Sequence, residues 1–154
     1  MDAPLETLNI TIDYQTLNEY NRYYFAKYPR RKKRPIDRPI HESLNIWTGL
    51  QSLARNNLKQ NWKEFIQWLV DKKHLNNYQV EFCDVRFEMF MPSRRRADND
   101  NFVPKFILDG FVESGFLIDD DSKHLNDLTL HCDYDKDNPR TEITFYIYKR
   151  RQYE

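Results

Sequence analysis

The sequence predicts an α+β fold, with a small mixed sheet of about four to five strands and two to three helices. Four short segments alternate apolar and polar residues with a period of two, the pattern of half-buried strands. Other segments repeat apolar residues every three or four positions, which is the helical pattern. Their order is strand, loop, helix, strand, helix, strand, strand, and this order favours a sheet with helices on one face.

The four strands are expected at residues 8–14, 83–91, 128–134 and 141–148. The last two are joined by the turn-rich "DKDNPR" and are predicted to form a hairpin. Residues 15–40 are interpreted as a long irregular connection, and a flexible basic loop is expected at about 27–40.

A helical pattern covers about 43–73, either as one long helix or as two, because "NWKE" at 61–64 resembles a capping box. A further helix is expected from about 102 to 114. Asn101 is its candidate N-cap, Pro104 lies in its first turn, and Gly115 ends it.

A length of 154 residues suits a single domain covering 1–154. No apolar run approaches the roughly 18 residues that span a bilayer, and the N-terminus does not resemble a signal peptide. We therefore expect a soluble, cytoplasmic protein without a membrane partner. Cys83 and Cys132 fall in strand-like segments and are expected to be reduced thiols, and the histidines lack the spacing of a zinc site.

The formal net charge of zero conceals a polarised chain. Residues 1–96 hold 17 basic and 11 acidic residues, whereas 97–154 hold 7 and 13, so the two parts carry +6 and −6. A balanced total argues weakly against nucleic-acid binding. The asymmetry favours it, because one region can meet phosphates while another collects carboxylates for a metal.

Two acidic clusters flank the predicted helix at 102–114. Asp98 and Asp100 precede it, and the run Asp119, Asp120 and Asp121 follows it after the apolar "GFLI". If the chain doubles back there, the clusters converge and favour a divalent cation with oxygen ligands. Both clusters are also good turn sequences, so solvated turns are the alternative.

A calcium loop starting at Asp98 is excluded by Val103, which stands where that loop needs glycine. Lys105 has two interpretations. It either pairs with Asp109 at a spacing of four residues, or it points toward the metal site and stabilises charge on a phosphate.

The segment "RRRADNDNFVPKFILDGFVESGFLIDDDSKH", residues 94–124, resembles the core motif of RusA-type Holliday-junction resolvases. That family shows a basic run, Asp-x-Asp-Asn, a lysine in the next helix, Leu-Asp-(Gly/Ala), and then Gly-x-hydrophobic-x-Asp-Asp. The matching positions here are Asp98 to Asn101, Lys105, Leu108 to Gly110, and Gly115 to Asp120. Lys105 departs from the pattern, because it lies five residues after the second aspartate where the family often has four.

The resemblance implies a RusA-like fold and a homodimeric, Mg²⁺-dependent endodeoxyribonuclease, for which Mn²⁺ can substitute. It implies that Asp98, Asp100 and Asp120 hold the metal and, with Lys105, carry catalysis. Asn101, Asp119 and Asp121 are possible additional site residues. The expected substrate is branched DNA, with four-way junctions cut by paired symmetric nicks.

The residue types suit this chemistry, since a carboxylate-held cation activates water and neutralises a phosphodiester. DNA contact is expected from two basic clusters, which are Arg30, Arg31, Lys32, Lys33 and Arg34 in the loop, and Arg94, Arg95 and Arg96 before the aspartates. The loop cluster could instead be a solvated loop. Two other functions stay open, namely a nuclease for flaps or forks, and a non-catalytic DNA-binding protein with the same fold.

Overall fold

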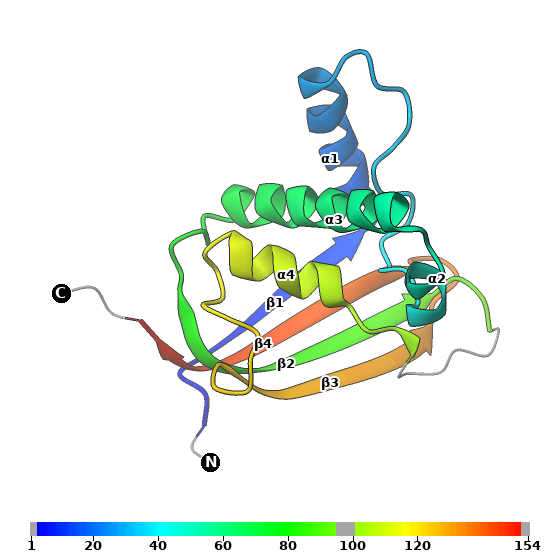
Figure 1. Cartoon of the computed structure of the whole chain (residues 1–154). Coiled ribbons are helices and arrows are strands. Elements are labelled where there is room, and N and C mark those ends of the chain that lie inside the picture. Colours follow the sequence, from blue (N-terminus) through cyan, green and yellow to red (C-terminus); the bar gives the residue numbers. More distant parts are fainter. Residues whose placement is uncertain (1–2, 95–100, 152–154) are drawn as a thin grey trace.

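The structure is a computed structural model, and it describes residues 3–94 and 101–151. It confirms the α+β class: one mixed four-stranded sheet and four helices (Figure 1). The elements in chain order are β1 (Glu6–Asp13), α1 (Tyr14–Lys27), α2 (Leu44–Thr48), α3 (Ser52–Lys72), β2 (Val80–Met91), α4 (Lys105–Glu113), β3 (Leu125–Tyr134) and β4 (Arg140–Arg150).

The sheet has the strand order β1-β4-β2-β3. β4 is antiparallel to both of its neighbours, whereas β2 and β3 are parallel. The predicted hairpin between the last two strands is therefore wrong, because β2 lies between β3 and β4. β3 instead follows α4 in a β2–α4–β3 unit, in which the helix crosses over the sheet before the chain returns parallel to β2.

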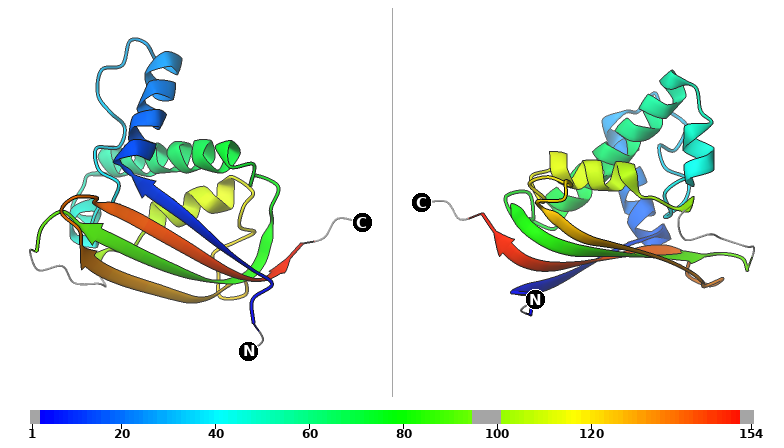
Figure 2. Two further views of the ribbon diagram at one scale, coloured as in Figure 1. Left: turned by 180° about the vertical axis from the view of Figure 1, so that it is seen from behind. Right: turned by 60° about the horizontal axis from the view of Figure 1, so that its bottom comes forward.

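The helices cover one face of the sheet, and the other face is open (Figures 1 and 2). The strand residues that point toward the helices form the core with apolar residues of α3 and α4. Val85, Phe87, Ile143 and Phe145 are at most 1% exposed. The alternation thus predicted correctly the side chains that β2 and β4 bury, whereas no residue of β3 is buried.

Residues 14–27 form helix α1, so the expected irregular connection at 15–40 is wrong for its first half. Leu17, Tyr20 and Tyr24 are buried at helical spacing, and the Asp13 carboxylate caps the helix by accepting the Thr16 N–H at 2.9 Å. The many tyrosines and asparagines weaken the apolar pattern, but the tyrosine rings supply the buried stripe. α1 rises from the end of β1 beyond α3, away from the sheet (Figure 1).

The helical region at 43–73 is two helices, α2 and α3, but the break lies at Gly49 to Gln51 rather than at "NWKE". α4 also starts later than predicted, at Lys105 with Pro104 as its N-cap. Asn101 does not cap α4, because its side-chain oxygen accepts the N–H of Asn45 at 3.3 Å. Pro104 has no N–H of its own, and it suits a helix start.

The open face of the sheet is predominantly acidic. Strand residues that point away from the helices include five carboxylates and two arginines, which are Asp84, Glu88, Asp127, Asp133, Glu142, Arg86 and Arg140. In the described part of the chain, no helix combines the length and the apolar character needed to cross a membrane.

Candidate functional site

Helix α4 is fixed at its start by a buried histidine from the loop before α2. His41 is 3% exposed, and its Nε2 accepts the N–H of Phe106 at 3.3 Å. Its Nδ1 lies 2.7 Å from the backbone oxygen of Glu42, so the ring is neutral with its proton on Nδ1. Burial lowers the pKa of His41 and keeps it in this form at neutral pH.

Three carboxylates gather between the middle of α4 and the start of β3; we call Asp109, Asp119 and Asp120 the acidic group. Partial burial raises the pKa of Asp120, and its hydrogen bond with Asp119 and the negative charges of Asp109 and Asp119 raise it further. The Asp120 N–H donates to a carboxylate oxygen of Asp119 at 2.7 Å. The neighbouring negative charges therefore disfavour the ionised form of Asp120, in addition to the effect of its partial burial.

The segment "GFLI" brings the acidic group back beside the sheet, as the sequence suggested. Leu117 forms a parallel bridge with Val80, and the Ile118 N–H donates to the Val80 oxygen at 3.0 Å. Gly115 makes this return possible, since its φ of +82° is unfavourable for other residues.

Asp121 has a structural role in the turn before β3. Its carboxylate lies 2.6 Å from His124 Nδ1 and accepts the Lys123 N–H at 3.1 Å, and its backbone oxygen accepts the N–H of Leu125. The hydrogen bond from His124 lowers the pKa of Asp121. Of the predicted acidic run, therefore, Asp119 and Asp120 join Asp109, while Asp121 closes the turn.

The remaining predicted ligands, Asp98 and Asp100, lie outside the described residues, as do Arg95 and Arg96. Residues on both sides of that segment are placed. The Arg94 guanidinium lies 4.5 Å from the ring centre of Tyr134, at the end of β3 far from Asp120. Asn101 contacts α2 through its bond to Asn45.

Lys105 is exposed at the first position of α4. Among the ion pairs between described residues, none joins it to Asp109, so the interpretation of Lys105 as a helix-surface partner of Asp109 finds no support. Lys105 lies four residues, or roughly 6 Å of helix, before Asp109.

Within residues 3–94 and 101–151, no three side chains of histidine, cysteine, aspartate or glutamate are arranged as a metal site. The metal site expected from the sequence thus depends on Asp98 and Asp100. The four residues between Asp100 and Lys105 are described, and they run toward α2, where the Asn101 side-chain oxygen accepts the N–H of Asn45. The oxygen-only donors of the group suit a hard cation such as Mg²⁺ or Mn²⁺.

The positive charge of the protein is concentrated in α1 and the loop that follows it. Residues 14–38, which we call the basic arm, hold eight basic and two acidic residues, a net charge of +6 in a chain of net charge zero. The arm lies on the helix side of the sheet, as does α4, which carries Asp109 of the acidic group (Figure 1). Of the predicted DNA contacts, Arg30, Arg31, Lys32, Lys33, Arg34 and Arg94 are exposed.

Arg31 differs from its basic neighbours because aromatic side chains hold it. Its Nη1 donates to the hydroxyl of Tyr24 at 2.9 Å, and its guanidinium carbon lies 3.9 Å from the ring centre of Tyr28. The loop is also anchored further on, where Ile36 and Ile40 are buried in the core. The basic side chains therefore extend from a loop that is attached at both ends.

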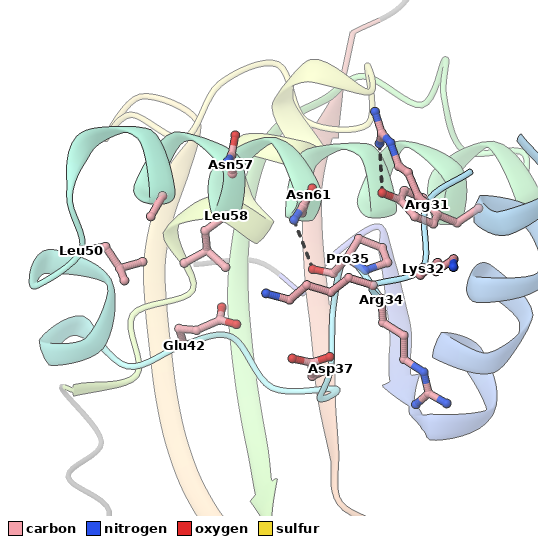
Figure 3. A pocket seen from close by; sticks show the side chains of 13 residues that line it. Arg31, Lys32, Arg34, Pro35, Asp37, Glu42, Leu50, Asn57, Leu58 and Asn61 are labelled. Atoms are coloured by element: carbon pink, nitrogen blue, oxygen red, sulfur yellow. Dashed lines mark hydrogen bonds between the residues drawn. The ribbon is translucent and has the colours of Figure 1, made fainter. Parts of the chain in front are cut away.

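A cleft of about 530 Å³ separates the basic arm from α3 (Figure 3). Lys32, Lys33 and Arg34 line it from the arm, and Asn57, Leu58 and Asn61 line it from α3. The Asn61 side chain donates to the Pro35 oxygen at 3.2 Å and links the two walls.

No protein-family model matches the chain, and no curated protein resembles it significantly in sequence. The class that the described residues define is an α+β protein with a basic arm and an acidic group on the same side of one sheet.

Sequence reasoning missed three residues of this region. The sequence indicated Asp109 only as a partner of Lys105 and as part of the motif, but its negative charge acts to raise the pKa of both Asp120 and His41. His41 and Glu42 were not singled out at all. The Glu42 carboxylate accepts the indole N–H of Trp62 at 2.7 Å, so this pair of residues ties the loop to both α3 and α4. No local sequence pattern predicts such contacts, because they depend on the tertiary fold.

Proposed function

We propose that the protein is a divalent-metal-dependent endodeoxyribonuclease that nicks branched DNA and resolves four-way junctions. The observation that carries the proposal is the acidic group, whose carboxylates repel one another on the same side of the sheet as the basic arm. The resemblance of residues 94–124 to the RusA-type motif supports it.

A bound Mg²⁺ would supply an activated water and neutralise the charge of the scissile phosphate. The protein's own contribution is to position the carboxylates and to hold the neighbouring phosphates. Asp120, held by Asp119 and placed by the return of the chain at Gly115, is the described member of the proposed ligand set. Asp98 and Asp100 would complete the set, and Lys105 would stabilise charge on the phosphate from the start of α4.

The basic arm would bind DNA on the same side of the sheet as this site, with α3 between the arm and α4. Its exposed cations and those at 94–96 match a polyanion, and their contribution depends on salt concentration because binding releases counterions. Cleavage at two symmetric positions would require two copies of the site, so a homodimer belongs to the same proposal.

The test is cleavage of a labelled four-way junction by purified protein in Mg²⁺ or Mn²⁺. We expect Asp100→Asn and Asp120→Asn to abolish cleavage while junction binding persists. Asp137→Asn is the matched control, because Asp137 is exposed in the turn between β3 and β4, and it should cut like the wild type. Normal cleavage by Asp120→Asn would show that the metal site is assigned wrongly.

Two alternatives have distinct outcomes in the same assay. A nuclease for other branched DNA would cut flaps or replication forks faster than junctions of matched sequence. A non-catalytic DNA-binding protein would bind the junction and cut nothing under any divalent metal.

A further inference from the structure

The cleft beside the basic arm combines surfaces of three kinds. Its apolar part consists of Leu50, Ala54 and Leu58 on the helical side, with Pro35 opposite. In Figure 3, Leu50 and Leu58 point into the space between α3 and the segment that carries Glu42. The methyl group of Ala54 leaves room there that a larger side chain would occupy.

Polar groups that suit the edge of a nucleobase lie within the same cleft. Asn57 is exposed and offers both a donor and an acceptor. Glu42 uses one carboxylate oxygen for the Trp62 indole, so its other oxygen is available as an acceptor for an amino group. Asp37 adds a second carboxylate to the lining.

The charges that line the cleft favour different positions for a base and for a phosphate. The lining holds four cations, Arg31, Lys32, Lys33 and Arg34, and two carboxylates, Asp37 and Glu42, so a phosphate is attracted to the cations of the arm and repelled from the part of the cleft beside the carboxylates. Lys32, Lys33 and Arg34 are exposed on the arm, where a backbone phosphate can reach them without entering. The cleft volume of about 530 Å³ is within the range of sites for a single small ligand and far too small for a duplex.

We propose that this cleft binds one unpaired nucleotide of a DNA strand, with its base against Leu58 and Asn57 and its phosphate on the lysines of the arm. Stacked and paired bases in a duplex cannot enter it, so the cleft selects DNA that offers an unpaired base, as a branch point can. The inference rests on the proposed function for the choice of DNA, and it adds a reason for preferring branched over regular duplex DNA.

The test is fluorescence anisotropy in EDTA, where no metal-dependent cleavage occurs, with a labelled duplex and the same duplex carrying a single-nucleotide bulge. Stacking on an aromatic ring contributes about 1–3 kcal/mol per base, and because Leu58 offers no ring we expect the low end of this range, so that the wild type binds the bulged duplex roughly fivefold more tightly. Ala54→Phe should remove this preference by filling the cleft.

Asn56→Phe is the matched control, because it places the same ring on the same helix at an exposed position that does not line the cleft. It should keep the preference. Lys33→Ala should weaken binding to both DNAs by a similar factor, since it contacts phosphate only. If circular dichroism shows that Ala54→Phe is unfolded, Asn57→Ala takes its place, because truncating an exposed amide leaves the fold intact.

Loss of the preference in Ala54→Phe but not in Asn56→Phe supports the inference. A wild type without preference for the bulge, or a preference that survives both Ala54→Phe and Asn57→Ala, overturns it. Junction cleavage in Mg²⁺ is measured in parallel. Cleavage without a bulge preference overturns the cleft assignment alone, and a bulge preference without cleavage of any branched DNA overturns the nuclease proposal alone. Failure to bind every DNA overturns both.

Discussion

Replacement of Gly110 by alanine should destabilise the protein by separating α3 from α4. Gly110 lies on the face of α4 that packs against Ile66 of α3. A Cβ atom at this position would be 2.7 Å from Ile66 Cβ and 3.0 and 3.1 Å from its Cγ2 and Cγ1. Carbon atoms in favourable contact are about 3.5–4.0 Å apart, so the helices must move apart by roughly 1 Å.

The size of the effect follows from two opposing contributions. Overpacking a core costs about 1–3 kcal/mol, and the upper part of this range applies because Ile66 Cβ is attached directly to the backbone and cannot rotate away. Alanine is favoured over glycine within a helix by about 1 kcal/mol, which offsets part of the cost. The expected net loss in the free energy of unfolding is about 2 kcal/mol, or a decrease in Tm of roughly 4–8 °C for a domain of this size.

Urea denaturation and thermal melting would measure the loss, and Gly49→Ala is the control. A Cβ at Gly49 would meet the Asn45 and Ile46 oxygens at 3.3 and 3.5 Å, and the Gly49 φ of −79° suits alanine. That variant should be close to the wild type or slightly more stable. A Gly110→Ala protein as stable as the Gly49→Ala control would refute the close packing of α3 on α4.

The same variant links packing to the site. Asp109 precedes Gly110, so a shift of α4 by about 1 Å displaces Asp109 from Asp119 and Asp120. Under the proposed function, a misplacement of this size lowers the cleavage rate by up to about 100-fold at temperatures where the protein remains folded.

Three further predictions concern the charged residues. Asp120→Asn should stabilise the metal-free protein at pH 7, because the raised pKa of Asp120 means that its charged form is unfavourable in the folded state. The gain in stability should vanish near pH 3, where the carboxyl is protonated in both the folded and the unfolded state. A Tm of the variant below that of the wild type at pH 7 would contradict this prediction. Arg31→Ala should increase the rate of cleavage by a lysine-specific protease at Lys32 and Lys33 several-fold, since it removes the contacts with Tyr24 and Tyr28, whereas Arg30→Ala should not. Burial lowers the pKa of His41 despite the nearby charges of Glu42 and Asp109, so the unfolded chain takes up a proton that the folded chain excludes. The free energy of unfolding should therefore fall as pH decreases below about 6.5, by at most about 1.4 kcal/mol per pH unit. His41→Gln should be less stable than the wild type at pH 7, and its stability should depend less on pH between pH 6.5 and 5.

The sequence predicted the strands well because their side chains alternate between the core and solvent. Val85 and Phe87 on β2, and Ile143 and Phe145 on β4, illustrate this pattern. The local alternation does not predict which strands pair with each other, however. The short connection of five residues between β3 and β4 suggested a hairpin, but the crossover through α4 makes β3 parallel to β2, and β4 pairs on the other side of β2.

Helix α1 was missed for a different reason. Its buried stripe is built largely from tyrosines, whose hydroxyl groups give the segment a polar average although Tyr20 and Tyr24 are buried. The sequence predicted the return of the chain through "GFLI", whereas the convergence of Asp120 with Asp98 and Asp100 stays a prediction because those two lie outside the described residues. It could not separate Asp119 from Asp121, because the difference lies in a turn hydrogen bond to His124.

Under the proposed function, the two faces of the sheet restrict how DNA can approach the protein. The open face carries the carboxylates of Asp84, Asp127 and Glu142 among others, with few cations to balance them. The basic arm, the cleft beside it and α4, which carries Asp109 of the acidic group, lie on the helix side. Exposed charges act over about 10 Å at 0.1 M salt, which is less than the thickness of the sheet and its helical layer together. A polyanion is therefore repelled from one face and attracted to the other, and the proposed function requires the attractive face to be the one that holds the carboxylates. Under the proposed function a metal ion joins these carboxylates to the phosphate, and without a metal the carboxylates would only weaken the binding of DNA.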